Sequence, residues 1–322
     1  MEETRLLLAS VLLASLAGGV VAVAAWNPLR PIRPLKGDGG KTILIFGGVT
    51  DSTAVLAYDT ETQKTVRRQS MPSRRLHVGA QKGGRMLFVG GYSKYDAPLL
   101  FDGEHFTEPN TPFKVAIRLQ ETHYWKTAAI AGDEFYSCGG ADADGAQTAE
   151  CYAYSFEKGR WREATAMPEA LRAVASAYHD GQLYAIGGID GSGKYKATVN
   201  RLDLRTGKWQ AVKPLPKPTV YGRALKVDIG PGEYGILFCG GLKKRRRATP
   251  DCWIYDIRNN RWHSASSLNQ GRIVFGLVSC GGGIYALGGD GLDSIERLGP
   301  FNWQLLPAKL PLPNDSFEVG CF

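Results

Sequence analysis

Residues 182–188 read QLYAIGG, an apolar run that ends in two glycines, and the chain repeats this pattern six times. The other copies are TILIFGG, RMLFVGG, EFYSCGG, GILFCGG and GIYALGG, which end at residues 48, 91, 140, 241 and 289. Successive first glycines stand 43, 49, 48, 53 and 48 residues apart. Regular spacing of this length indicates a repeat protein rather than two unrelated domains.

Each repeat carries further landmarks in a constant order. After the glycine pair come a variable loop, a β-rich run that ends near Tyr-Asp, and a Trp six residues beyond the acidic position. Trp161, Trp209 and Trp262 show this best. Before the fourth pair, residues 179–182 (HDGQ) read as a tight hairpin turn. Each repeat therefore predicts a four-stranded meander, and six such sheets bury a core by closing into an all-β ring.

The pattern resembles the kelch repeat over residues 41–322. The double glycine, the Tyr-Asp and the spaced Trp are all present, with two local departures: Thr65 replaces Trp in blade one, and blade two has a shortened hairpin at residues 101–103. The resemblance implies a six-bladed kelch-type β-propeller over residues 42–322. It also implies that the glycine pairs let adjacent sheets approach and that the tryptophans pack between blades, so these residues are structural.

The two ends of the repeat region indicate how the ring closes. At Lys41 the chain enters directly into the strand that ends in the first glycine pair, so blade one lacks an inner strand. Residues 317–322 (FEVGCF) follow the last blade as an inner strand follows its loop. We expect this C-terminal segment to supply the innermost strand of blade one.

The N-terminal segment is apolar enough to meet a membrane. Residues 6–26 are 21 residues without a charge, close to the roughly 20 that cross a bilayer as a helix. One interpretation is a signal peptide, with Val23 and Ala25 as the small residues before a cut at Trp26.

The other interpretation is a retained signal anchor. The flanking cations Arg30, Arg33 and Lys36 would then hold the ring in the cytosol by the positive-inside rule. Under either interpretation we expect a hydrophobic helix within residues 1–26, followed by a Pro/Gly linker at residues 27–41. Because only 41 residues precede the ring, we expect no dimerisation domain or ubiquitin-ligase adaptor before it.

Four of the six cysteines follow the repeats. In blades three and five a Cys precedes the glycine pair and a second stands thirteen residues later, whereas the other blades have neither. This predicts two cross-strand disulfides, Cys138–Cys151 and Cys239–Cys252, with free buried cysteines as the alternative. Cys280 and Cys321 lie on inner strands of adjacent blades, offset by about three residues, and we expect them to stay unpaired.

The cysteines also bear on localisation. Disulfides would indicate an oxidising compartment, and hence a secreted or membrane-anchored protein of the secretory pathway; a membrane-anchored ring facing the cytosol is the alternative. Asn314 opens an Asn-Asp-Ser glycosylation sequon in a predicted surface loop.

The positive charge of the chain is concentrated in one loop. The net charge is +8, of which residues 42–322 hold +6. Five of those cations are contiguous in the loop after the fifth glycine pair, namely Lys243, Lys244, Arg245, Arg246 and Arg247. This run is either a solvated loop or a site for an acidic peptide, a sulfated glycan or an anionic lipid. A nuclear-localisation tract in a cytosolic ring, and a basic cleavage site in a secreted one, are the other interpretations.

Strand alternation places further cations near this run, because the loops after the second and fourth strands of a meander emerge at the same end. The connections between blades carry Arg75, Arg172, Arg223 and Arg272. The same connections hold three candidate aromatic anchors, Tyr124, Trp125 and Tyr221. The resemblance implies that this face binds protein segments, with arginines pairing to carboxylates; arginines that stack on neighbouring blades are the alternative.

Kelch-type rings also include enzymes, namely galactose-oxidase-like copper oxidases and sialic-acid mutarotases. The histidines fall at different repeat positions, so we expect no shared metal site and no cofactor: His77, His105, His123, His179 and His263. A mutarotase needs only an acid and a base in the channel, and Glu318 beside His77 is the pairing to test.

No phosphate-binding loop or nucleophile elbow occurs in the sequence. We therefore expect a monomeric, non-catalytic protein-interaction module that binds an acidic partner and no nucleic acid. The alternative is a secreted or periplasmic-type sugar mutarotase or epimerase.

Overall fold

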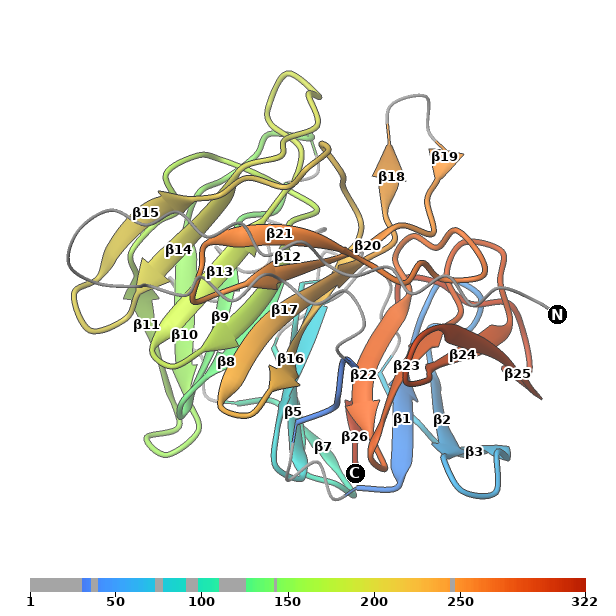
Figure 1. The fold of residues 1–322 in the computed structure, drawn as a ribbon. Helices are drawn as coiled ribbons and strands as arrows, with labels where there is room; N and C mark the ends of the chain where they lie inside the picture. The colour runs from blue at the N-terminus through green and yellow to red at the C-terminus, as the bar shows by residue number, and fades with distance from the viewer. Residues whose placement is uncertain are drawn as a thin grey trace, which may run out of the picture.

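The strands of this chain form a ring of six sheets around a central axis (Figure 1). The structure is a computed structural model that describes residues 31–35, 40–72, 78–90, 98–109, 126–141, 144–243 and 247–322. The expected hydrophobic helix within residues 1–26 lies outside these ranges. Within them, no helix is long and apolar enough to cross a membrane.

Every sheet is a four-stranded antiparallel meander that runs from an innermost strand to the rim of the ring. From the inside outward, blade one contains β26 (Glu318–Cys321), β1 (Thr42–Phe46), β2 (Ala54–Asp59) and β3 (Thr65–Ser70). Blade two contains β4 (Val78–Lys82), β5 (Arg85–Val89), β6 (Leu99–Phe101) and β7 (Phe106–Thr107). Blade three contains β8 (Thr127–Ala131), β9 (Glu134–Cys138), β10 (Cys151–Ser155) and β11 (Arg160–Ala164).

The second half of the chain repeats the arrangement. Blade four contains β12 (Ala175–His179), β13 (Gln182–Ile186), β14 (Val199–Asp203) and β15 (Lys208–Val212). Blade five contains β16 (Arg223–Gly230), β17 (Glu233–Cys239), β20 (Cys252–Asp256) and β21 (Arg261–Ala265), and its loop carries the hairpin of β18 (Leu242–Lys243) and β19 (Arg247–Ala248). Blade six contains β22 (Gly276–Cys280), β23 (Gly283–Leu287), β24 (Ser294–Leu298) and β25 (Trp303–Lys309).

The C-terminal strand closes the ring, as the sequence predicted. β26 pairs antiparallel with β1, with Phe46 opposite Glu318 and Ile43 opposite Cys321. The Phe322 amide donates to the Thr42 carbonyl oxygen at 2.8 Å, which extends the pairing to the last residue. Blade one is therefore built from both ends of the ring.

The glycine pairs allow the close approach of neighbouring blades. Each first glycine has a φ between 57° and 70°, a left-handed conformation that favours glycine. A Cβ on Gly240 would lie 2.6 Å from the Arg272 carbonyl oxygen, and the Gly241 amide donates to the same oxygen at 2.7 Å. A side chain on Gly240 would push blades five and six apart, and one on Gly241 would clash with the connection that enters blade five, where its Cβ would lie 2.7 Å from the Val220 carbonyl oxygen.

The repeated tryptophans join consecutive blades. The indole Nε1 of Trp209 donates to the Thr165 carbonyl oxygen of blade three at 3.1 Å. That of Trp262 donates to the Lys213 carbonyl oxygen of blade four at 2.9 Å. The apolar core likewise lies between sheets: Tyr58 of blade one packs in one cluster with Val278 and Tyr285 of blade six.

Three disulfides cross-link the ring. Cys138–Cys151 and Cys239–Cys252 join opposite residues of neighbouring strands, as predicted. Cys280 and Cys321 also form a disulfide, with Cα atoms 5.3 Å apart, so the expectation that they stay unpaired was wrong. β22 and β26 are neighbouring inner strands of different sheets and share no hydrogen-bond ladder. Aligning the repeats therefore did not predict how far one strand is shifted along the channel axis relative to the other.

The Asn314 side chain is not on the surface. It is 6% exposed, and its Nδ2 donates to the Gly47 carbonyl oxygen at 3.0 Å. The loop packs against the first glycine pair through this bond and also against the sixth pair, where a Cβ on Gly288 would meet the Asn314 carbonyl oxygen at 2.7 Å. The prediction of a surface loop was therefore wrong at this residue, which seals blade six against blade one.

Candidate functional site

The six inner strands enclose a small cavity at one end of the channel. We call this end, where the inner strands begin, the upper face, and the opposite end the lower face. The cavity has a volume of about 140 Å³. Residues at the start of each inner strand line it, among them Gly79, Lys126, Ala175, Arg223, Gly276 and Glu318. Small residues leave room for one side chain or one small ligand, with charged groups in the wall.

Two of these charged residues form an ion pair across the cavity wall. Arg223 Nη2 lies 3.2 Å from Glu318 Oε1, and Arg223 Nε donates to the Phe275 carbonyl oxygen at 2.8 Å. Glu318 is 8% exposed, and this burial raises the pKa of its carboxyl, an effect that the Arg223 charge opposes. The pair joins blade five to the closing strand across the inner strand of blade six.

Lys126 is the third charged group of the cavity, and the sequence analysis did not identify it. Its side chain is 6% exposed. Burial lowers the pKa of its amine to about 7, against a weaker opposing effect of Glu150. The available signal was its position, since Lys126 directly precedes an inner strand whose residues are small (TAAIA). A cation before such a strand reaches the channel.

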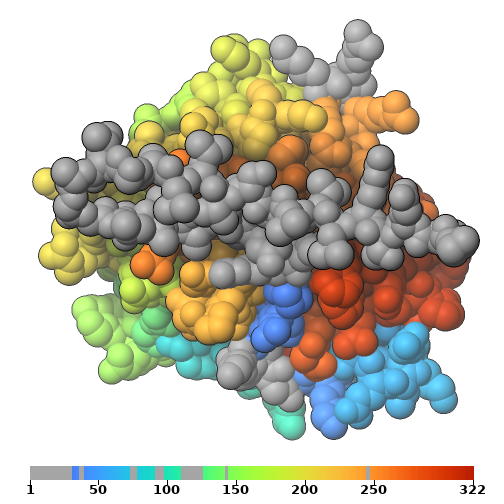
Figure 2. Space-filling view, viewed as in Figure 1, coloured from blue at the N-terminus to red at the C-terminus, as the bar shows by residue number. Residues whose placement is uncertain are grey.

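The predicted basic run forms a hairpin that projects from the upper face (Figures 1 and 2). Lys243 Nζ lies 2.5 Å from Asp251 Oδ2, whereas Arg247 is exposed. Leu242 and Val220 exchange two backbone hydrogen bonds of 2.7 and 3.2 Å, which fix the hairpin beside the blade connection that contains Tyr221. Residues 244–246 lie outside the described residues.

Arg272 has a structural role, contrary to the prediction that it lines the mouth. Its side chain is fully buried, and its Nη2 and Nε donate to Glu296 Oε1 at 2.9 and 3.1 Å. The guanidinium also donates to the carbonyl oxygens of Gly288 and Ser294. These bonds tie the connection before blade six to its second and third strands, so no partner can reach this arginine.

The structure describes only some of the other predicted site residues. Arg172 is half-buried and pairs through its backbone with Ile189, and Tyr221 is half-buried in the wall of a smaller pocket shared with Lys126 and Arg223. The remaining candidates lie outside the described residues: Arg75, His77, Tyr124 and Trp125. The structure thus brings together Arg223, Tyr221 and the base of the basic hairpin.

The upper face therefore combines a charged cavity with a cationic projection. Within the described ranges, no group of three or more His, Cys, Asp or Glu side chains is arranged to hold a metal ion. The chemistry that the face offers is electrostatic: two cations and one carboxyl at the cavity, and further cations on the hairpin.

Comparison with known proteins identifies the repeats. A family model described as the KLHDC2/KLHL20/DRC7 Kelch-repeats domain matches residues 107–289, more than half of the chain. A solved structure titled "Structure of YjhT" superposes with a TM-score of 0.64 at 13% sequence identity, covering 87% of this chain and 98% of that chain. At that identity the likeness shows the fold alone. Together with the six glycine pairs and the closed ring, the match shows that this chain belongs to the kelch-repeat family.

Proposed function

We propose that this propeller is a non-catalytic protein-interaction module whose upper face binds an acidic segment of a partner. The observation that supports it most is the placement of cations both at the cavity and on the hairpin beside it. Lys126 and Arg223 stand at the cavity, and Lys243 and Arg247 stand on the hairpin that projects beside it. The lower end of the channel contributes none of these groups.

The two parts of the face would act at different stages of binding. The exposed hairpin attracts an acidic segment over several ångströms, which raises the rate of encounter and depends on salt. At the cavity, a carboxylate of the partner would bind the Arg223 guanidinium, which the ion pair with Glu318 holds in place. Little water competes with that contact. Charge-assisted hydrogen bonds are stronger there than on an open surface.

A titration with a deca-glutamate peptide tests this proposal. Replacing the five contiguous cations, residues 243–247, by Gln should weaken binding at least tenfold at low salt and flatten its salt dependence. Heparin as a second probe separates a sulfated glycan from an acidic peptide. The matched control carries Arg160→Gln, Arg205→Gln and Arg258→Gln on the lower face and should bind as wild type. Equal weakening in both variants would contradict the proposal.

A second candidate, a sugar mutarotase or epimerase, has one specific observation in its favour. Glu318 and Lys126 are two titratable groups on the same cavity, and burial moves the pKa of each toward neutrality. Such a pair can serve as acid and base in anomer exchange. This candidate predicts that the ring accelerates exchange between the anomers of a sialic acid in NMR, and that Glu318→Gln abolishes it while Arg247→Gln does not.

We further propose that residues 6–26 direct the chain to a membrane of the secretory pathway. The three disulfides support an oxidising compartment. The intact mass of the mature chain separates the two interpretations of the segment, because cleavage before Trp26 removes 25 residues and a retained anchor removes none. A mature chain with reduced cysteines on the cytosolic side would contradict this localisation.

A further inference from the structure

The linker before the ring docks onto the lower face. Arg33 and Asp228 form an antiparallel bridge in which each amide donates to the other's carbonyl oxygen, at 2.9 and 3.0 Å. Ile32 packs against the core cluster that contains Val227 and Ile229. Two hydrogen bonds and an apolar contact hold residues 31–35, which we call the strap, in a defined place.

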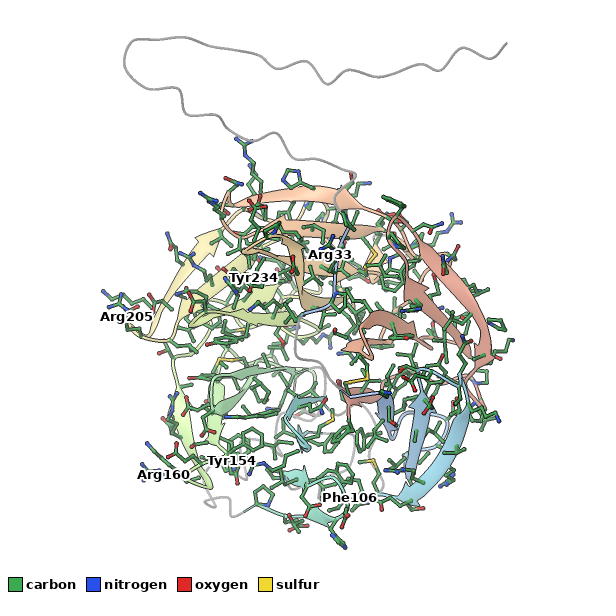
Figure 3. The ribbon with its side chains drawn as sticks, turned by 60° about the horizontal axis from the view of Figure 1, so that its bottom comes forward. Arg33, Phe106, Tyr154, Arg160, Arg205 and Tyr234 are labelled. Carbon is green, nitrogen blue, oxygen red and sulfur yellow. A yellow bond between two sulfur atoms is a disulfide. The ribbon has the colours of Figure 1, made fainter. Side chains whose placement is uncertain are left out.

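Blade five is built to receive the strap. Its inner strand β16 has eight residues, whereas each other inner strand has four or five. The additional residues lie at its lower end, where Asp228 and a register shift before Gly230 present backbone groups to Arg33. The strap therefore leaves the ring beside blade five, on the face opposite the cavity (Figure 3).

The strap is close in sequence to the apolar segment. Arg33 stands only seven positions after Trp26, and a fully extended chain over seven positions spans at most about 25 Å. If residues 6–26 lie in a bilayer, the lower face of blade five cannot be farther than this from the end of the segment. A tether this short keeps the lower face of blade five close to the bilayer.

Charge on the lower face is uneven around the ring. The outer turns of blades three, four and five hold six exposed cations: Lys158, Arg160, Arg205, Lys208, Arg258 and Arg261. The acidic residues of the same outer turns are Glu157, Asp203 and Asp256. Only the first is exposed, and the other two accept hydrogen bonds from their own turns. The outer turns on the side of the strap are therefore basic, whereas the inner turns of the same blades hold the acidic residues Asp133, Glu134, Asp180, Asp228 and Glu233.

The remaining outer turns are different. In blade one Glu61 pairs with Lys41 at 2.8 Å, and in blade two Asp102 and Glu104 are both exposed. The turn of blade six has no charged residue, but its Phe301 is 71% exposed. Basic turns thus occupy one continuous half of the rim. Arg160 and Arg205 lie at the periphery of the ring, and Arg33 lies nearer its axis (Figure 3).

We propose that the lower turns of blades three to five face an anionic lipid surface, held there by the strap, so that the upper face is presented away from the membrane. This inference rests on the proposed membrane segment being retained. A short tether keeps the local concentration of lipid headgroups high, so modest attraction by each cation suffices to orient the ring. The surface and the partner site are then separate functions of opposite faces.

The full chain reconstituted in nanodiscs tests the orientation. In discs of phosphatidylcholine with 30% phosphatidylglycerol, the amides of residues 156–160, 204–208 and 257–261 should exchange hydrogen at least threefold more slowly than in phosphatidylcholine discs. The triple variant Arg160→Gln, Arg205→Gln and Arg258→Gln should lose this protection. Lys243→Gln with Arg247→Gln on the upper face should keep it. All replaced residues other than Lys243 are exposed, so we expect both variants to fold. Near-ultraviolet circular dichroism spectra identical to that of wild type verify this.

Two different failures can be told apart. If alkaline carbonate strips the chain from natural membranes, the retained segment is wrong and the orientation fails with it. If the chain stays in the membrane but the three turns exchange equally in both disc types, or the upper hairpin is protected instead, the membrane segment stands and only the lipid-facing surface is overturned. Neither outcome affects binding of the deca-glutamate peptide by the upper face.

Discussion

Arg223 and Glu318 lie 95 positions apart in the sequence, yet they form an ion pair of 3.2 Å at the mouth of the channel. Glu318 belongs to β26, the strand that closes the ring, and Arg223 begins the inner strand of blade five. The cavity wall is therefore complete only when the ring is closed. Ring closure and the electrostatics of the site depend on each other.

The titration of Glu318 should be visible in the stability of the ring. Because burial raises the pKa of this carboxyl in the folded state, the folded state binds its proton more tightly than the unfolded state does. The stability that the Glu318 carboxyl contributes is fully present below a pH of about 4.5, and it is lost as the pH rises through the pKa of the folded state. Wild type should lose stability relative to Glu318→Gln over this range. Thermal melts of both proteins between pH 4 and 8 measure the difference, and parallel curves would contradict the assigned burial.

Lys126 should produce the opposite dependence. Burial lowers the pKa of its amine from 10.5 to about 7, so between these values the unfolded chain binds the proton and the folded ring does not. The contribution of this group is therefore present at high pH and lost as the pH falls through 7. Wild type should gain stability relative to Lys126→Met from pH 7 to pH 10. A constant difference between the two proteins would show that the amine is not buried in the folded ring.

Arg272 should be essential for stability and not for binding. Removing one partner of a buried ion pair leaves the other charge uncompensated and costs roughly 3–5 kcal/mol. Arg272→Met should therefore destabilise the ring by about this amount in urea unfolding, and Arg272→Met with Glu296→Leu should recover most of it. Arg247→Gln is the exposed control, with an expected change below about 0.5 kcal/mol. A folded and stable Arg272→Met variant that had lost peptide binding would instead support the original prediction that Arg272 binds the partner at the mouth of the channel.

The Cys280–Cys321 disulfide should contribute more stability than either disulfide within a blade. It closes a stretch of 41 residues, whereas Cys138–Cys151 closes 13. Loop-closure entropy assigns about 4 kcal/mol to the longer loop and about 3 kcal/mol to the shorter one. Denaturant unfolding of the two Cys-to-Ala double variants compares them. A smaller loss for Cys280→Ala with Cys321→Ala would mean that β26 is held by its strand pairing alone.

Deleting the closing strand should unfold the whole ring. Residues 316–322 contribute the fully buried Phe317 and the complete pairing with β1. Without them, blade one has three strands and blade six loses its neighbour, so the closed core cannot form. The truncated chain should lack a cooperative melting transition. A transition within a few degrees of wild type would contradict this closure.

The architecture could be predicted from the sequence because kelch landmarks report on backbone geometry. A glycine at positive φ and a Trp that bonds to the preceding blade recur at fixed spacing, and residues 317–322 matched the pattern of an inner strand. Each of these features is local to one repeat. Their agreement over six repeats was sufficient to predict the ring and its closure.

The site could be predicted only in part, because side chains at equivalent repeat positions meet different partners. Arg223 begins its inner strand and Arg272 stands four residues before its own, but only Arg272 finds a buried carboxylate, Glu296, within its own blade. Lys126 stands two to four positions nearer its glycine pair than the predicted arginines and was missed. Contacts between blades, such as Cys280 with Cys321, depend on how neighbouring sheets are offset, which no single repeat encodes.

The most direct test of the proposed function is to map where an acidic segment binds. A deca-glutamate peptide with a photoreactive group at one end can be cross-linked to the ring and the modified residues found by mass spectrometry. The account predicts adducts on the connections between blades and on the hairpin around Lys243 and Arg247, all on the upper face. Adducts concentrated on the lower turns, or spread evenly over both faces, would contradict it.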